Sequence, residues 1–379
     1  MKMKDLHKQY AILRPEIDKA ISVVLNEQNF IQGSQVAFLE QQLAEYVGIT
    51  YCDTCANGTD ALQLALMACG VQSGDAVFVP DFTFIATASS VYLLGATPIF
   101  VDIDRDTYNM SAESLEEAVN KVISEGKLIP KAVIAVDLFG LPADYVSISA
   151  IAKKHDIKVI EDGAQGFGGA IGQQRACSFG DIATTSFFPA KPLGGYGDGG
   201  AIFTNDKQSH DLCVSLRAQG CSNEDKYDNV ICGFNSRLDT IQAAILIPKL
   251  EVFRKYELEA VNSIATRYTE MLNDIVGTPF IPRGYCSSWA QYTIKVNDED
   301  IRQKLIKYLS NKDIQTSIYY PRALHEQKAF SALKTVVDCK NAIDLSKCVL
   351  SIPIYPYMTD DEVLYVGEAI RSFFVEGVS

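Results

Sequence analysis

The middle of this 379-residue chain alternates short, unbroken apolar segments with longer stretches whose apolar residues recur at helical spacing. Apolar runs without polar alternation are typical of strands buried on both faces, as in parallel sheets. The strand-like segments span 77–80, 98–102, 132–136, 158–162, 182–185 and 201–204, and the helical ones include 61–68, 111–122 and 147–154. This pattern predicts an α/β fold in which helices cover both faces of a mainly parallel sheet.

The N-terminal region reads as two helices joined by a loop, within residues 14–47. Pro15 suits the start of the first helix, because proline is tolerated where the backbone N–H has no helical partner. The second helix is indicated by Val36, Leu39, Leu43 and Val47, which recur at helical spacing.

The chain changes character after about residue 250. A long predicted helix over 255–273 leads into an α+β pattern, with a strand at 292–296, a helix at 298–309 and an extended segment at 316–319. We therefore expect two domains. Residues 1–250 would hold the N-terminal helices and the large domain, and residues 251–379 a smaller α+β domain.

The charge balance excludes one class of partner. The net charge is −13, whereas nucleic-acid binding needs clustered Lys and Arg, so we expect no nucleic-acid partner. No apolar stretch approaches the roughly 18 residues of a membrane span, and no apolar run follows the first residues, so we expect neither a membrane segment nor a signal peptide. An anionic substrate would then depend on a few individual arginines.

Ten cysteines without a predicted signal peptide are typical of reduced thiols in the cytoplasm, which is where we expect this protein. Cys52 and Cys55 form a C-x-x-C pair, a spacing also found in redox and metal sites. However, no second cysteine pair follows, and the four histidines are isolated in sequence. We therefore expect no metal site and a structural place for Cys52 and Cys55.

A single lysine, Lys191, lies among apolar, small and hydroxyl residues in the segment 184–200 and precedes a glycine-rich turn. Burial lowers the pKa of a lysine, and a neutral lysine amine can form a Schiff base with a carbonyl. Ser186 stands five residues earlier, and Asp162 ends an apolar strand upstream. Such a carboxylate can keep a pyridine nitrogen protonated, and Gln165 could bond the phenolic oxygen of the same ring. Together these residues indicate pyridoxal phosphate.

Two further segments fit this cofactor. Asn57, Gly58 and Thr59 precede an apolar helix, and its N-terminus offers free N–H groups and the positive end of a dipole to a phosphate. The same residues could be a plain helix cap. Phe84 follows the strand that ends at Pro80, where an aromatic ring can cover a flat cofactor or pack in the core.

The segment 195–200 also satisfies the dinucleotide-binding pattern G-x-G-x-x-G. That motif must follow a strand and open a helix, but here it leads into the strand predicted at 201–204. A dinucleotide-binding fold is therefore rejected.

Six sequence blocks in one order resemble the DegT/DnrJ/EryC1/StrS sugar aminotransferases, from about Leu6 to near residue 370. The blocks are 57–62, 82–87, 161–165, 186–191, 197–200 and 233–239. The resemblance implies the fold type I of pyridoxal phosphate-dependent transferases and a homodimer with shared active sites. It also implies transfer of an amino group from glutamate to a keto sugar attached to a nucleotide.

The resemblance assigns roles to individual residues. Lys191 would carry the cofactor and shuttle protons. The cofactor's other contacts would be Asp162 at the ring nitrogen, Gln165 at the ring oxygen, Phe84 against the ring, Gly58, Thr59 and Ser186 at the phosphate, and Asn235 at the phosphate of the other subunit.

Segments 191–200 and 237–246 resemble the branch that acts on UDP-2-acetamido-2-deoxy-3-oxo-glucuronate, which implies a 3-amino uronic acid for bacterial surface polysaccharide such as O-antigen. In that branch Arg237 would bind the sugar carboxylate, although it could instead serve the dimer interface. Tyr319, Tyr320 and His325 belong to the loop that would contact the sugar, and Tyr319 stands where the branch often has histidine.

Three alternatives remain beside this hypothesis. The substrate could be a dTDP- or UDP-linked 6-deoxy keto sugar, aminated at C3 or C4. Some similar proteins are sugar dehydratases, which carry histidine in place of the lysine, and others are regulators or sensors. Lys191, Asp162 and Ser186 are all present here, and this argues against both of these latter classes.

Overall fold

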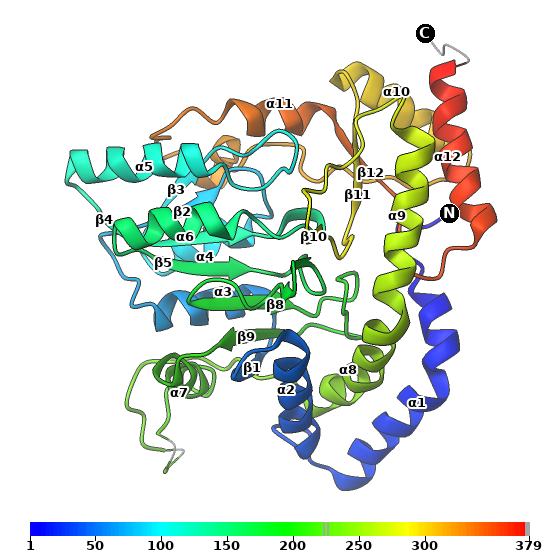
Figure 1. Ribbon diagram of the computed structural model, residues 1–379. Helices are drawn as coiled ribbons and strands as arrows, with labels where there is room; N and C mark the ends of the chain where they lie inside the picture. Colours follow the sequence, from blue (N-terminus) through cyan, green and yellow to red (C-terminus); the bar gives the residue numbers. More distant parts are fainter. Residues whose placement is uncertain (223, 226, 376–379) are drawn as a thin grey trace.

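A seven-stranded sheet runs through the centre of the computed structural model, which describes residues 1–222, 224–225 and 227–375 (Figure 1). In spatial order its strands are β1 (Tyr51–Cys55), β9 (Gly200–Thr204), β8 (Ile182–Ser186), β5 (Lys158–Asp162), β4 (Ile129–Val136), β2 (Asp75–Pro80) and β3 (Thr97–Val101). Strand β9 is antiparallel to β1 and β8, while the pairs from β8 to β3 are parallel. The prediction of a mainly parallel sheet is confirmed.

Strand β1 was missing from the sequence-based prediction. Asp53 and Thr54 interrupt its apolar residues, yet both are buried in the structure. Their polar groups are satisfied there: the Asp53 carboxylate pairs with His210, and Thr54 donates to Glu40 from both its N–H and its hydroxyl. Because these partners lie far away in sequence, local hydropathy gave no signal for this strand.

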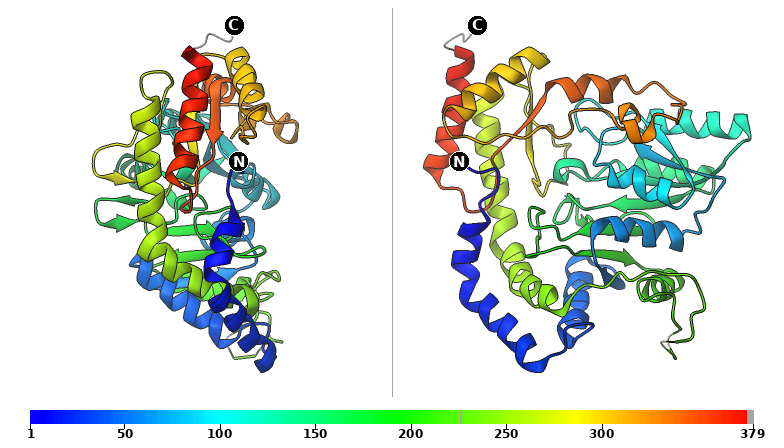
Figure 2. Two further views of the ribbon diagram at one scale, coloured as in Figure 1. Left: turned by 90° about the vertical axis from the view of Figure 1, so that its right-hand side faces the viewer. Right: turned by 180° about the vertical axis from the view of Figure 1, so that it is seen from behind.

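Helices cover both faces of the sheet, as predicted. Helices α3 (Gly58–Ala68) and α4 (Ala86–Leu93) contact each other, as do α5 (Ala112–Glu125) and α6 (Tyr145–Lys154). The connections through α3 and α4 advance along the sheet in one direction and those through α5 and α6 in the other. Since parallel crossovers are right-handed, the two pairs lie on opposite faces (Figures 1 and 2). Helix α7 (Lys207–Leu216) contacts α3 and β1.

The N-terminal helix α1 (Leu6–Glu27) begins earlier than predicted and carries Pro15 inside it. Pro15 removes the hydrogen bond to the carbonyl of Ala11, but both residues are exposed, so water can reach that carbonyl. On the other side of α1, Leu13 and Ile17 pack with Ile245 of α8 (Thr240–Val252). The prediction that the helix starts at Pro15 is therefore wrong. Helix α2 (Ser34–Val47) has the predicted buried face.

The C-terminal region adds a second layered unit. Its longer elements are α9 (Leu258–Leu272), β11 (Tyr292–Lys295), α10 (Glu299–Ser310), α11 (Lys340–Cys348), β12 (Val349–Ile352) and α12 (Asp360–Val375). Strands β11 and β12 form an antiparallel pair, and α9 and α12 run side by side (Figures 1 and 2). The short elements of the chain are β6 (Ala170–Ile171), β7 (Gln174–Arg175), β10 (Tyr285–Cys286), η1 (Leu138–Gly140), η3 (Leu324–Glu326) and η4 (Lys328–Phe330).

The two regions are joined by one continuous helical run. Helix α8 passes through a π-helical turn, η2 (Phe253–Glu257), directly into α9, so residue 250 lies inside a helix. One hydrophobic cluster extends from the central sheet to α9, β11, β12 and α12. The division into domains after residue 250 stays a prediction. None of the described helices has both the length and the apolar character needed to cross a membrane.

Candidate active site

The predicted cofactor residues gather at the carboxyl ends of the parallel strands. Asp81 follows β2, Asp162 is the last residue of β5, and Ser186 is the last residue of β8. Ligand sites of α/β sheets lie at this edge because the strands end there together and loops carry polar groups above them. Thus residues that are 24 to 105 positions apart in sequence meet at one edge of the sheet.

The N-terminus of α3 forms one wall of the site. Asn57 caps the helix, since its side-chain oxygen accepts a hydrogen bond from the N–H of Asp60 at 2.9 Å. A Cβ on Gly58 would lie only 2.7 Å from the Cβ of Ser186, so the close approach of these two residues requires glycine. A helix N-terminus beside a serine hydroxyl suits a phosphate group. Both readings of this segment therefore hold together: Asn57 caps the helix, and Gly58, Thr59 and Ser186 form a cradle fit for phosphate.

The carboxylate of Asp162 is buried and oriented from two sides. Its Oδ2 accepts a hydrogen bond from the Thr87 hydroxyl at 3.0 Å, and its Oδ1 accepts one from the N–H of Ala164 at 3.2 Å. Burial raises the pKa of Asp162, and the positive charge of Lys191 opposes that rise. A buried carboxylate held in this way suits a cationic partner such as a protonated pyridine nitrogen.

Lys191 lies in the turn after β8, where its backbone N–H bonds to the carbonyl of Phe188. Burial lowers the pKa of the Lys191 amine, and the nearby Asp162 carboxylate partly offsets this shift. A lowered pKa leaves more of the neutral amine that a Schiff base requires. The pair of Lys191 and Asp162, beside a phosphate cradle, therefore fits pyridoxal phosphate.

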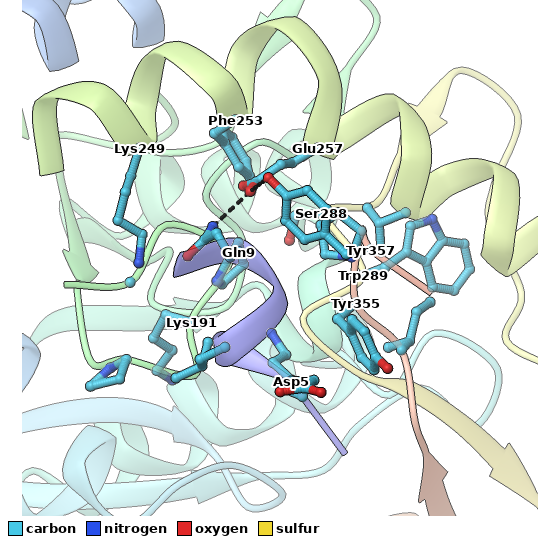
Figure 3. A pocket seen from close by; sticks show the side chains of 18 residues that line it. Asp5, Gln9, Lys191, Lys249, Phe253, Glu257, Ser288, Trp289, Tyr355 and Tyr357 are labelled. Atoms are coloured by element: carbon cyan, nitrogen blue, oxygen red, sulfur yellow. Dashed lines mark hydrogen bonds between the residues drawn. The ribbon is translucent and has the colours of Figure 1, made fainter. Parts of the chain in front are cut away.

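Lys191 also lines a cavity together with residues that the sequence did not indicate (Figure 3). Among these are Lys4, Lys249 and Glu257, and the carboxylate of Glu257 accepts hydrogen bonds from Gln9 and from the Tyr357 hydroxyl, each at 2.6 Å. Burial and the charge of Lys191 lower the pKa of Lys4 to about 7. Gln9, Lys249 and Glu257 come from α1, α8 and η2, whereas Lys4 precedes α1 and Tyr357 lies between β12 and α12. None of these segments has a local motif that points to the site.

Gln165 and Tyr320, both predicted site residues, contact each other. The Oε1 of Gln165 accepts a hydrogen bond from the N–H of Phe139 at 2.7 Å, and its Nε2 donates to the Tyr320 hydroxyl at 3.1 Å. The Tyr320 ring lies 6.0 Å from that of Phe82 and 6.4 Å from that of Phe84, measured between centroids. Phe82 is core, whereas Phe84 is 54% exposed and so is available to cover a ligand.

The segment 319–325 reaches the sheet edge through its last residue. The Nδ1 of His325 lies 2.5 Å from Oδ2 of Asp81, and its backbone N–H donates to Oδ1 of Asp81 at 2.9 Å. This ring edge is thus occupied by a protein group, and the predicted contact of His325 with a sugar stays a prediction. Tyr319 is half-buried and its ring packs edge-on against that of Tyr320.

The segment with Asn235 and Arg237 packs near α3 of its own chain. The hydroxyl of Ser236 accepts from the N–H of Ala56 at 3.1 Å and donates to Asp60 at 2.7 Å. Asn235 is exposed, and Nε of Arg237 is buried without a hydrogen-bond partner among the described residues. The roles predicted for Asn235 and Arg237 depend on a second subunit or a substrate and stay predictions.

Two sequence alternatives can be judged from the structure. The glycine-rich segment 195–200 leads into β9, as expected, and packs on Gln242 of α8, whose Oε1 accepts from the N–H of Tyr196 at 2.9 Å.

Cys52 and Cys55 are free thiols buried in β1, and burial raises the pKa of both, that of Cys55 to about 12. Such thiols are poor nucleophiles.

Known proteins resemble this chain over almost its whole length. An aminotransferase for UDP-2-acetamido-2-deoxy-3-oxo-D-glucuronate from Pseudomonas aeruginosa is 42% identical over 370 residues, which cover 97% of this chain and 99% of the relative. A pleiotropic regulatory protein from Geobacillus stearothermophilus is 39% identical, covering 98% of each chain. A 3-aminotransferase for UDP-N-acetyl-3-dehydro-α-D-glucosamine from Acidithiobacillus ferrooxidans is also 39% identical, covering 97% of this chain and 96% of the relative.

The fold agrees with these relatives. The crystal structure of a DegT/DnrJ/EryC1/StrS aminotransferase from Brucella abortus superposes with a TM-score of 0.96 at 45% identity, covering 99% of each chain. The model of the DegT/DnrJ/EryC1/StrS aminotransferase family matches residues 11–371. This chain therefore belongs to that family and is a pyridoxal phosphate-dependent sugar aminotransferase.

Proposed function

We propose that this enzyme transfers an amino group from glutamate to a nucleotide-linked 3-keto sugar, with UDP-2-acetamido-2-deoxy-3-oxo-glucuronate as the substrate. The observation that carries the reaction is the charge interaction between half-buried Lys191 and buried Asp162, beside the cradle of Gly58 and Ser186. The relative from Pseudomonas aeruginosa, named for this substrate, supports the choice of sugar.

The chain's own residues divide the chemical work. Pyridoxal phosphate, when bound, supplies an electron sink for the carbon that loses a proton. Lys191 Nζ would take that proton and later return it, because burial lowers the pKa of its amine. Asp162, held by Thr87 and Ala164, would be the partner of the ring nitrogen. The cradle at α3 would hold the phosphate and so position the ring.

Arg237 supports recognition of the uronate. A buried guanidinium nitrogen without a hydrogen-bond partner destabilises the protein. A ligand that offers this nitrogen a hydrogen-bond acceptor would therefore bind more tightly. A sugar carboxylate can bind guanidinium with two parallel hydrogen bonds. A 6-deoxy sugar has a methyl group at the corresponding position and would leave Arg237 unsatisfied.

We also propose a homodimer, with the second copy seated over the mouth of the site. Two large apolar side chains that border the predicted cofactor residues, Phe84 and Phe188, are exposed in the single chain, as are Leu93, Val230 and Ile231 elsewhere on its surface. A second copy would cover these residues and bring its Asn235 toward the phosphate.

The ten free thiols fit an enzyme of the cytoplasm. The amino sugar that it makes would serve the synthesis of surface polysaccharide such as O-antigen.

The test is a panel of UDP- and dTDP-linked keto sugars, with and without a carboxylate, assayed with glutamate. We expect the 3-keto uronate to give 2-oxoglutarate and a product with the mass of the amino sugar. Faster turnover of a 6-deoxy keto sugar would replace the uronate assignment, and no transfer to any sugar would contradict the proposed function. The mass of the complex in solution tests the dimer.

A further inference from the structure

Asp81 is the anchor of the segment 319–325, here called the sugar loop. Its carboxylate is completely buried at the end of β2. His325 gives it two hydrogen bonds, one from the backbone at 2.9 Å and one through ring Nδ1 at 2.5 Å, and the N–H of Leu324 bonds to its carbonyl at 2.8 Å. Two consecutive residues of the loop are thus bound to one residue of the sheet, more than 240 positions away.

The same aspartate starts the segment that covers the cofactor site. Phe84 follows three residues later, and Thr87, which bonds to Asp162, six residues later. At the other end of the sugar loop, Tyr320 bonds to Gln165. Asp81 therefore connects two segments that border the site, one on the cofactor side and one on the substrate side.

Nδ1 of His325 bonds directly to Oδ2 of Asp81, and a ring nitrogen that donates to a carboxylate has no lone pair for a metal ion. Cys339 lies close enough to both residues to complete a three-ligand group. Burial and the charges of Asp81 and Asp102 raise the pKa of its thiol, so the sulfur of the metal-free protein stays protonated. These observations favour a hydrogen-bonded anchor over a metal centre.

The electrostatics of the pair stabilise its bonded form. Burial raises the pKa of Asp81, and His325 partly offsets this; the hydrogen bond to Asp81 in turn raises the pKa of His325. The other charged groups that act on His325 are Glu326 and Asp102, both carboxylates, which also favour a protonated ring. A protonated histidine bound to a buried carboxylate resists replacement by water, so the sugar loop has one preferred position.

We propose that Asp81 is a positioning residue for the keto-sugar step: through His325 it fixes the sugar loop, and with it Tyr320 on Gln165, in the conformation that binds the sugar. This rests on the proposed function. The glutamate step uses Asp162 at the end of β5 and Lys191 in the turn after β8. The sugar nucleotide is the larger substrate and extends to the sugar loop. Loss of the anchor therefore impairs the two half-reactions unequally.

The experiment compares Asp81→Asn, His325→Gln and the double variant with Asp53→Asn. Asp53 is a matched control, because it is a buried aspartate whose Oδ2 lies 2.9 Å from Nδ1 of His210, on β1 and outside the site. Each holoenzyme is mixed with glutamate alone and then with the keto sugar, and the cofactor absorbance gives the rate and half-saturation of each step. The melting temperature of each variant is recorded as well.

We expect both single variants to raise the KM for the sugar about tenfold or more, since displacement of binding groups by about 1 Å has effects of this size. The glutamate step should change by less than about twofold, and the double variant should be no worse than either single one. Asp53→Asn should lower the melting temperature and leave both steps unchanged.

A readout without any substrate separates this inference from the proposed function. The side-chain amide resonance of Gln165 in the unliganded protein should shift in Asp81→Asn and His325→Gln, because Tyr320 leaves it, and should stay in place in Asp53→Asn. Equal loss in both half-reactions, an unchanged sugar KM or an unmoved Gln165 resonance would overturn the positioning role. A wild-type enzyme that aminates no keto sugar would instead overturn the proposed function.

Discussion

Thr87 of α4 donates a hydrogen bond to Oδ2 of Asp162 at the end of β5, across 3.0 Å. The two residues are 75 positions apart, and the bond orients the carboxylate whose charge acts on Lys191. The helix that follows Phe84, the residue predicted to cover the ring, thus also orients the group expected at the pyridine nitrogen. This arrangement ties the electrostatics of the cofactor to the packing of the site, and the first predictions below depend on it.

Lys191→Ala should fold but lose the visible absorbance of the lysine-bound cofactor and all turnover. The reason is that the variant has no amine to bind the cofactor carbonyl or to move the proton. The absorbance spectrum and the release of 2-oxoglutarate measure the two effects, and circular dichroism checks the fold. Turnover by this variant would contradict the assignment of Lys191.

Asp162→Asn should retain the cofactor but slow turnover about a hundredfold or more, because a neutral amide does not keep the ring nitrogen protonated. The loss should appear in kcat rather than in the half-saturation for substrates. Thr87→Val is the matched control: it removes one hydrogen bond to the carboxylate, worth about 1 kcal/mol, and leaves the charge. Near-normal rates in Asp162→Asn would show another role for this residue.

Arg237→Ala should reduce the stabilisation of the transition state for the uronate substrate by about 2 kcal/mol or more, because the carboxylate loses its charged partner. A 6-deoxy keto sugar without the carboxylate should lose much less. The comparison of kcat/KM for the two sugars in wild type and variant measures this difference. Equal efficiency of wild type with both sugars would exclude carboxylate recognition by Arg237.

Gly58→Ala should weaken binding of pyridoxal phosphate about tenfold. The added Cβ would lie 2.7 Å from the Cβ of Ser186. The end of β8 or the start of α3 must then move, and this movement costs about 1–3 kcal/mol of free energy. Cofactor titration of the unloaded protein gives the affinity. Gly74→Ala is a control with open space around the new Cβ, although its positive φ makes it a test of stability rather than of binding.

The stability of the protein without cofactor should fall as the pH rises from about 4 to about 7. Burial raises the pKa of Asp137 to about 7, and the pKa of its buried neighbour Glu161 is raised as well. A raised pKa means that the folded state binds the proton more tightly, so its contribution to stability is complete below the ordinary carboxyl pKa of about 4 and is lost as the pH passes the folded value.

Asp137→Asn should flatten this dependence. An asparagine can still accept the hydrogen bonds that Asp137 receives from the Tyr145 hydroxyl at 2.8 Å and the N–H of Ala143 at 3.0 Å, but it cannot ionise. Urea unfolding at a series of pH values measures the slope for both proteins. A variant with the same slope as wild type would show that Asp137 does not titrate in this range.

Local sequence was sufficient for most of the fold and for the positions of Asp162 and Ser186 at strand ends. Unbroken apolar strands predicted the parallel sheet, and strand ends located Asp162 and Ser186, because the period and length of an element are set by neighbours along the chain. The cap of α3 could be predicted for the same reason, because Asn57 acts on the helix that follows it directly. Where a distant partner overrides the local pattern, the prediction failed, as with the polar strand β1 and the start of α1 at Pro15.

The substrate side was decided by tertiary structure. Sequence marked Gln165, Tyr320 and His325, but not that Gln165 holds Tyr320 or that Asp81 holds His325. These contacts join residues 155 and 244 positions apart, and no short-range pattern encodes them. They form because the sheet brings the ends of β2 and β5 together under a loop from the C-terminal region. A hydrogen bond between distant segments depends on that topology, whereas a helix cap or a strand depends only on the residues beside it.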